Sequence, residues 1–292
     1  MAAENESQSL QQRRKQIWGV FSSDPAGWLS EQAKGRAWKL FVAFWAFYIL
    51  APPVMLVFIS FDTASYIRIP QAFSFERFEL MLQNPKVMSS IQQSLKYAAI
   101  TTVVAPLFAL LAVLAYRKTE RKALFIALIV LPLFIPGVVH GIGLLIFFQQ
   151  LGVESSLIRV TIGHVLWAFP FSFLVLLTSA SAVTDDLLLA SSDLGANEFE
   201  TFRNVIYPLI KPGLISATIF SFVLSFNEFA RTFYLIGNSN TVPTFVWASL
   251  QVEFSRELYA VAGSAVMLSL SLIGLGTFYL YMEAKQGRMS HS

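Results

Sequence analysis

Residues 96–116 read KYAAITTVVAPLFALLAVLAY, and their only charged side chain is that of Lys96 at the first position. An α-helix needs about 20 apolar residues to cross the ~30 Å hydrocarbon core of a bilayer, and this stretch is that long. Charged residues make up 13% of the chain and hydrophobic residues 55%, whereas an average soluble domain is roughly 25% charged. The run therefore predicts a transmembrane helix in an integral membrane protein.

Apolar runs of similar length occur on both sides of this one, and together they predict six membrane spans. The runs cover residues 38–61, 96–116, 123–148, 157–183, 214–236 and 258–282. Pro132 and Pro136 interrupt the third run, so it forms either one kinked helix or two shorter pieces, and we count it as one broken span. The expected fold class is all-α, with a transmembrane domain over 38–282 between an N-terminal segment, 1–37, and a tail, 283–292.

Lysine and arginine are unevenly distributed between the two sides of these spans, and cytoplasmic segments of membrane proteins are enriched in both. With the N-terminus inside, the cytoplasmic segments hold fourteen of the 21 basic residues: Arg13, Arg14, Lys15, Lys34, Arg36, Lys39, Arg117, Lys118, Arg121, Lys122, Arg203, Lys211, Lys285 and Arg288. The other side holds Arg68, Arg77, Lys86, Arg159 and Arg256. This distribution favours an even number of spans with both termini in the cytoplasm.

Three connections between the spans are expected to carry short helices. Residues 62–95 lie outside and contain an amphipathic stretch, 75–82, that can rest at the membrane interface. Residues 244–254, also outside, place Trp247, Leu250 and Phe254 at helical spacing, and packing on the outer mouth or in the headgroups is favoured over a ligand contact. Residues 184–213 are cytoplasmic and contain five of the 18 acidic residues.

The cytoplasmic connection contains DDLLLASSDLGA (185–196), which predicts a short amphipathic helix that stops at Gly195, where glycine can turn the chain. A second helix is expected over 198–206, with Asn197 as its N-cap and acidic residues in its first turn. Pro208 and Pro212 are expected to end this helix before the next span. Exposed leucines at this density indicate a partner protein rather than a solvated linker.

This loop resembles the signature of the permease subunits of binding-protein-dependent ABC importers, which reads Glu-Ala-Ala, three residues, Gly, nine residues, Ile, any residue, Leu-Pro. Gly195 and Pro208 stand at the Gly and Pro positions, while Val205 and Tyr207 stand at the Ile and Leu positions. The first triplet is Leu189-Ala190-Ser191. The wider likeness runs from about residue 38 to 282 and is closest to the second permease subunit of spermidine and putrescine importers.

The resemblance implies a MetI-like permease fold in the bacterial inner membrane, and a non-catalytic role as a pore-forming subunit of an ATP-driven importer. The partners it implies are a second permease subunit, a dimer of ATP-binding subunits that hold ATP and Mg²⁺, an external solute-binding protein and membrane lipid. It implies no cofactor in this chain and no nucleic acid. The solute it implies is small and cationic, a polyamine. Arg231 within the fifth span would repel such a cation, and this departure from the family also admits a zwitterion such as an amino-acid derivative.

In this family the first loop helix inserts into a groove on the ATPase subunit. The resemblance therefore assigns that contact to Asp185, Leu188, Leu189, Ala190, Asp193, Leu194, Gly195, Ala196 and Pro208. Leu189 stands where the family commonly has a glutamate that helps docking, and Asp185, Asp186 or Asp193 can take over that role.

Glu228 and Arg231 are the first candidates for the path of the solute, because ionisable groups within a span are costly and either line a cavity or have a partner. They lie three residues apart and share one face of a helix. Two interpretations stand: an ion pair that neutralises itself, or two groups that bracket a charged solute. Ser225 and Asn227 extend this polar face, and Trp167 can either stack on a cation or pack against lipid.

Several other kinds of chemistry are excluded by the sequence. The chain has no cysteine, which excludes disulfides and Cys-based zinc sites, and no Gly-Lys dipeptide, which a phosphate-binding loop requires. His140 and His164 lack the spacing of a zinc hydrolase and are expected to be hydrogen-bonded packing residues, so we expect no metal site. The alternative function is a stand-alone secondary transporter or channel, which would be expected to carry acids in several spans.

Overall fold

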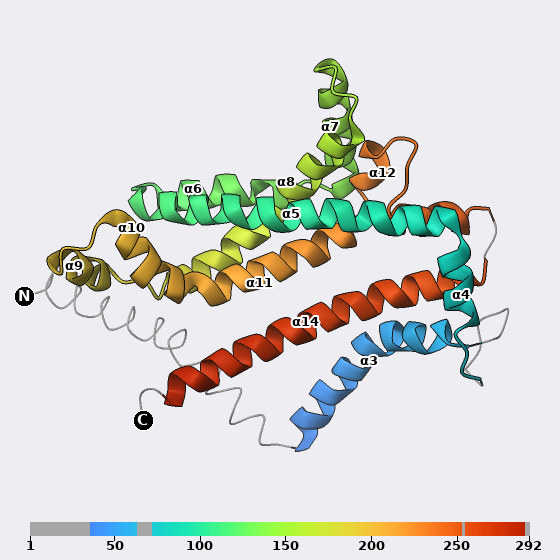
Figure 1. Ribbon diagram of the computed structural model, residues 1–292, viewed down its shortest axis with the longest axis horizontal. Coiled ribbons are helices and arrows are strands. Elements are labelled where there is room, and N and C mark those ends of the chain that lie inside the picture. Colours follow the sequence, from blue (N-terminus) through green and yellow to red (C-terminus); the bar gives the residue numbers. More distant parts are fainter. Residues whose placement is uncertain (1–35, 63–71, 253–254, 290–292) are drawn as a thin grey trace, which may run out of the picture. The chain divides into compact units, whose positions relative to one another are not determined.

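The computed structural model of the chain describes residues 36–62, 72–252 and 255–289 (Figure 1). Within these ranges the secondary structure is helical and contains no strand, which confirms the all-α prediction. Residues 1–35, with four of the basic residues counted above, lie outside the described ranges, as do Arg68 and Phe254.

The helical segments, in chain order, are α3 (Arg36–Ser60), α4 (Glu76–Gln83), α5 (Pro85–Lys118), α6 (Lys122–Val130), the 3₁₀ turn η1 (Leu131–Phe134), α7 (Gly137–Gln150), α8 (Ser156–Ala180), α9 (Asp185–Asp193), α10 (Glu198–Thr201), the π-helical turn η2 (Phe202–Ile206), α11 (Tyr207–Phe226), α12 (Thr232–Leu235), α13 (Val242–Leu250) and α14 (Glu257–Met289). The chain divides into two compact units, residues 1–55 and 56–292. In the first unit, the rings of Phe44, Trp45 and Tyr48 on α3 contact one another.

Five helices in the described ranges are long and apolar enough to cross a membrane: Lys39–Ser60, Pro85–Lys118, Ser156–Ala180, Glu198–Phe226 and Glu257–Met282. A sixth candidate is a bent pair, Lys122–Phe134 with Gly137–Gln150, whose two parts meet at 96°. The bend lies at Pro132 and Pro136, as expected from two residues without an N–H to donate to the preceding turn. The described ranges therefore hold five candidate spans, or six if the bent pair is one broken span.

Two predicted helix ends are wrong. The fifth span was expected to continue to residue 236, but α11 ends at Phe226, and residues 227–231 connect it to the short α12 without helical structure. Pro208 and Pro212 were expected to end the second loop helix, but α10, η2 and α11 follow one another without interruption. The π-helical turn, which ends at Ile206, two residues before Pro208, alters the spacing of the carbonyl groups, which lets a helix continue past a residue that cannot donate.

The larger unit is built around α5, α8 and α11, which run side by side (Figure 1). Their shared core includes Val113 from α5, Phe173 and Leu176 from α8, and Ile210 from α11. Gly213 allows α11 to approach α8 closely, because a Cβ atom there would lie only 2.5 Å from Cβ of Ser179. This packing fixes the start of α11 and hence the loop that precedes it.

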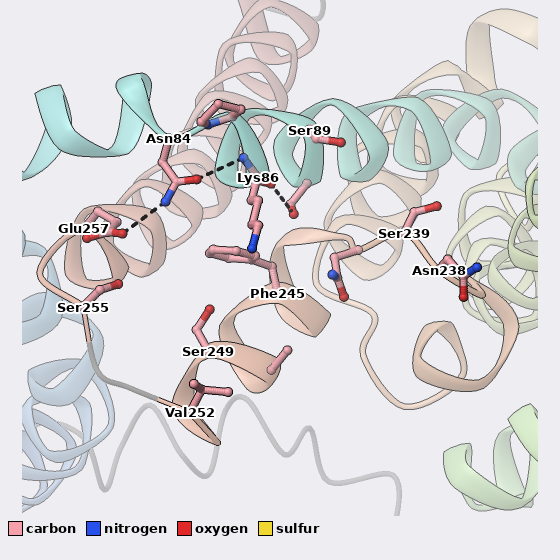
Figure 2. Close-up of a pocket in the computed structure, with 14 residues that line it drawn as sticks. Asn84, Lys86, Ser89, Asn238, Ser239, Phe245, Ser249, Val252, Ser255 and Glu257 are labelled. Carbon is pink, nitrogen blue, oxygen red and sulfur yellow. Dashed lines mark hydrogen bonds between the residues drawn. The ribbon is translucent and has the colours of Figure 1, made fainter.

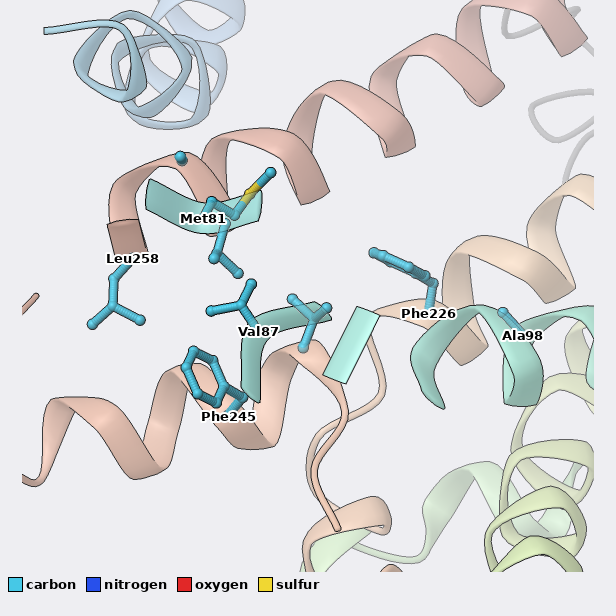
Figure 3. Close-up of a cluster of buried hydrophobic side chains, with 9 residues drawn as sticks. Met81, Val87, Ala98, Phe226, Phe245 and Leu258 are labelled. Carbon is cyan, nitrogen blue, oxygen red and sulfur yellow. The ribbon is translucent and has the colours of Figure 1, made fainter. Parts of the chain in front are cut away.

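A second core cluster joins the ends of several helices on the side that we predict to be outside (Figure 3). Met81 of α4, Val87 of α5, Phe226 of α11, Phe245 of α13 and Leu258 of α14 are all buried in it. The two expected outer helices, α4 and α13, are thus present and packed. α13 buries Phe245, however, and not the predicted stripe, since Trp247 and Leu250 are exposed.

Candidate functional site

The first helix of the polar loop, α9, ends as predicted at Gly195. The glycine has φ +80°, its N–H donates to the Ser192 carbonyl at 2.9 Å, and the Ala196 N–H donates to the Ser191 carbonyl at 3.1 Å. These two hydrogen bonds form a Schellman motif, in which a left-handed glycine satisfies the last free carbonyls of a helix. The chain can therefore turn sharply into α10.

The second loop helix begins with the predicted N-cap. The Asn197 side chain accepts a hydrogen bond from the Glu200 N–H at 3.0 Å, and the Glu200 carboxylate accepts one from the Asn197 N–H at 2.9 Å, a complete capping box. Ser191 of α9 is buried and shares a 2.8 Å hydrogen bond with Thr201 of α10. α9 and α10 are thus joined as one angular unit.

Four large apolar side chains of this unit are exposed: Leu187, Leu189, Leu194 and Phe199, here called the loop surface. Leu189 is 63% exposed, Leu194 88% and Phe199 68%. Leu188 is partly buried, because it packs against the core that α5, α8 and α11 share. Ala190, Asp193, Gly195 and Pro208 are exposed and Ala196 is partly exposed, which places most of the predicted residues around the loop surface.

Arg117, at the end of α5, holds the start of α9. Its guanidinium group donates to the Val183 carbonyl at 2.6 Å and lies 3.0 Å from the Asp185 carboxylate. Asp185 was predicted to contact a partner, but one of its oxygens already has a partner in its own chain. The Arg117 contact fixes the direction in which the loop surface leaves the transmembrane helices.

The predicted pair Glu228 and Arg231 forms a buried ion pair at the break between α11 and α12. An Arg231 terminal nitrogen lies 3.1 Å from Oε1 of Glu228, and the same oxygen accepts the Arg231 N–H at 2.9 Å. The Glu228 side chain is 8% exposed and the Arg231 side chain 3%. Their separation of three residues does bring them together, although they lie in a turn and not on a regular helix.

Two further groups hold the Arg231 guanidinium. Its Nε donates to Nδ1 of His140 in α7 at 3.1 Å, and its central carbon lies 4.0 Å from the centre of the Trp167 ring in α8. α7 can approach because it presents glycine here: a Cβ on Gly141 would lie 3.0 Å from the Arg231 Cα. We call Glu228, Arg231, His140 and Trp167 the arginine cluster.

Two polar residues near the arginine cluster, His164 and Asn227, make their hydrogen bonds within the chain. His164 is buried and makes 2.7 Å hydrogen bonds with Ser225 of α11 and Thr232 of α12, as expected for a packing histidine. Asn227 is exposed, and its amide donates to the Val223 carbonyl and to Ser269 of α14. Among the described residues, no group of three or more His, Asp or Glu is placed to hold a metal ion.

A groove of about 680 Å³, lined by both polar and apolar residues, lies between the start of α5 and α13 (Figure 2). Lys86, Ser89, Asn238, Ser249 and Glu257 are among the residues that line it, and Asn84 donates to Glu257 at 3.2 Å. No candidate site residue named from the sequence lies in this groove.

Comparison with known protein families assigns the chain to one of them. Residues 105–287 match the family described as binding-protein-dependent transport system inner membrane component. The chain belongs to this family. It is therefore an inner-membrane permease of the ABC importer class, in agreement with the resemblance found in its loop.

Curated relatives include polyamine permeases. The permease protein PotC of the spermidine/putrescine transport system of Escherichia coli (strain K12) is 27% identical over 229 residues, which cover 77% of this importer permease and 87% of PotC. The permease protein PotI of the putrescine transport system of the same strain is 23% identical over 263 residues, covering 86% and 93%. The molybdenum transport system permease protein ModB of Mycobacterium bovis is 26% identical over 211 residues, covering 68% and 78%.

Solved structures confirm the permease fold. An amino acid ABC transporter crystallised with histidines shares it with a TM-score of 0.55 at 15% identity, over 72% of this chain and 98% of that one. A bacterial alginate ABC transporter in complex with an alginate pentasaccharide-bound periplasmic protein gives a TM-score of 0.56 at 15% identity, over 87% and 96%.

Sequence reasoning missed several contributors to both regions of this importer permease. Phe199 is an apolar residue between two glutamates, a signal that could have marked it as a contact residue. Arg117 was counted only as a topology signal. The contacts of His140 and Trp167 with Arg231 join residues more than 60 positions apart, and no local pattern announces them.

Proposed function

We propose that this chain is a translocation subunit of an ATP-driven importer and that its loop surface docks on a separate ATPase subunit. Support comes from the family and from Leu189, Leu194 and Phe199, which are exposed on a segment that is otherwise polar. Contiguous exposed apolar side chains next to charged ones are typical of a protein interface. The ATPase subunit supplies the nucleotide site with ATP and Mg²⁺, because this chain has no phosphate-binding motif.

The same proposal fixes the orientation and the other partners. The loop lies in the cytoplasm with both termini, as the distribution of Lys and Arg favours. A second permease subunit completes the pore, and an external solute-binding protein delivers the solute. The alginate importer, solved in complex with its periplasmic protein, offers a precedent for such an assembly.

The solute that the chain fits best is a small organic cation, with a zwitterion as the less favoured class. The named solutes of PotC and PotI, spermidine and putrescine, support a cation, and so does Glu228 beside the aromatic ring of Trp167. We assign the path to Ser225, Asn227, Glu228, Arg231 and Trp167. Arg231 neutralises Glu228 in this structure, so the acid is open to a solute only when Arg231 has moved.

The exposed loop surface carries the proposal, and copurification with the ATPase tests it. Leu194→Asp combined with Phe199→Asp puts two charges where an apolar groove is expected, so the affinity for the ATPase should fall by about tenfold or more. Val252→Asp is the matched control, because Val252 is 89% exposed and lies in the segment that we predict to be outside. The double variant should reach the membrane but lose its ATPase in mild detergent, whereas Val252→Asp should retain it. Wild-type recovery of ATPase with the double variant would refute the docking assignment.

A further inference from the structure

The groups around Arg231 are those that recognise an organic cation of any origin. The Glu228 carboxylate supplies the opposite charge, the Trp167 ring supplies a π face, and the His140 ring nitrogen accepts an N–H. A carboxylate with an aromatic face binds guanidinium and primary ammonium groups in general, because both carry a delocalised or compact positive charge and N–H donors. None of these contacts requires the cation to be attached to the protein.

The cluster lies where two helices of the transmembrane domain are interrupted. α7 starts directly after the break at Pro136, and α11 ends at Phe226, two residues before Glu228. Membrane transporters build solute sites at such discontinuous helices, since irregular backbone at membrane depth is tolerated only beside protein or a water-filled cavity. Two helix breaks meet at this cation, and α7 contacts α12 there (Figure 1).

The backbone of Arg231 is fixed, and its side chain is the part that can leave. A Cβ on Gly137 would lie 2.8 Å from the Ala230 Cβ, and one on Gly141 would lie 3.0 Å from the Arg231 Cα. Because α7 packs directly on residues 230 and 231, the segment cannot shift without separating two helices. Rotation about the side-chain bonds of Arg231, by contrast, empties the space between Glu228 and Trp167.

We propose that Glu228, Trp167 and His140 form a binding site for a guanidinium or primary ammonium group, which Arg231 fills as an internal ligand until the cationic group of the solute takes its place. The cation site itself does not depend on the proposed import function. Only the displacement of Arg231 by a solute rests on it. Arg231 then acts as a competitor that keeps the site from holding a solute tightly. Its removal should convert an occupied site into a free one.

The first test measures cation binding without transport. The assembled complex with Arg231→Ala is heated with increasing methylguanidinium chloride and, separately, with sodium chloride at equal ionic strength. We expect a saturable rise of the unfolding midpoint with methylguanidinium only, because a ligand that binds the folded state stabilises it by mass action. Wild type, whose site is filled by Arg231, should need about tenfold more methylguanidinium for the same rise, since the internal ligand lowers the fraction of sites that can bind. The control Glu228→Gln with Arg231→Ala, which lacks the carboxylate, should show no saturable rise.

If the Arg231→Ala complex is not recovered without a cation, the same comparison is made on the yield of complex extracted in methylguanidinium against sodium chloride. The cation site is overturned if methylguanidinium raises the unfolding midpoint, or the yield, of Arg231→Ala no more than it does for the double variant Glu228→Gln with Arg231→Ala. This outcome is independent of whether the complex imports anything.

The second test asks whether the solute uses the site. ATP-driven uptake of labelled putrescine is measured in proteoliposomes with methylguanidinium as the competitor. The competitor should act on Arg231→Ala at about tenfold lower concentration than on wild type, since an internal ligand lowers the fraction of sites that can bind. A saturable midpoint shift without any such difference in competition would make the site purely structural and overturn the displacement step. If wild type takes up no putrescine with ATP, the proposed solute fails while the midpoint result stands.

Discussion

At the scale of single residues, the Glu228–Arg231 pair shows what spacing alone can and cannot predict. The three-residue separation predicted that the two groups share one face and left open whether they pair with each other or bracket a solute, and the structure shows them in contact. The separation was not enough to place them in a turn, because nothing in the sequence marks Phe226 as the last residue of α11. His140 and Trp167 complete the cluster through tertiary packing, which no local pattern encodes.

Neutralising one member of this pair should be worse than neutralising both. Glu228→Gln leaves the Arg231 charge buried without its carboxylate, which costs about 3 kcal/mol of stability, and adding Arg231→Gln should recover most of it. Unfolding of the detergent-solubilised complex measures both. Glu76→Gln is the control, because Glu76 and Arg256 form an ion pair whose side chains are about half exposed, and its loss should cost at most about 1 kcal/mol. A double variant no more stable than Glu228→Gln would contradict this account of the pair.

At the scale of helices, the sequence predicted the elements better than their ends. Five apolar helices of spanning length and one bent pair, the Gly195 stop and the Asn197 cap agree with the prediction, because hydrophobic length and capping residues act locally. The prediction that Pro208 and Pro212 end a helix is wrong, since a π-helical turn precedes Pro208 and the helix continues. The start of α5 at Pro85 was also missed, because its first turns are polar and carry no membrane signal.

The contact between α8 and α11 depends on Gly213, which faces Ser179. Enlarging the first residue and then shrinking the second should test this packing. Gly213→Ala places a methyl group against Ser179 and should cost about 1–3 kcal/mol of stability through overpacking. Ser179→Gly in the same chain should relieve part of this cost. Gly143→Ala serves as the control, because nothing lies within 4 Å of a Cβ there, so the change should be neutral or stabilising in a helix. The measurement is the unfolding midpoint of wild type and the three variants, and equal midpoints would show that the two helices do not pack this closely.

At the scale of the whole molecule, the loop surface and the arginine cluster lie at opposite ends of α11. The loop surface follows α8 and precedes α11, whereas the arginine cluster lies where α11 ends. α11 therefore connects the segment proposed to contact the ATPase with the segment proposed to contact the solute. The sequence alone predicted the family and the loop, because both depend on local motif spacing. The contacts that hold the loop in place, such as those of Arg117, could not be predicted from it.

The most direct measurement of the central claim is solute uptake by the reconstituted complex. Proteoliposomes that contain this chain, its partner permease and the ATPase subunits are supplied with labelled putrescine, the external binding protein and internal ATP. We predict uptake that requires both ATP and the binding protein, and that disappears with the combined Leu194→Asp and Phe199→Asp changes. Uptake by this chain alone, without ATP or the ATPase subunits, would contradict the account and identify a stand-alone transporter.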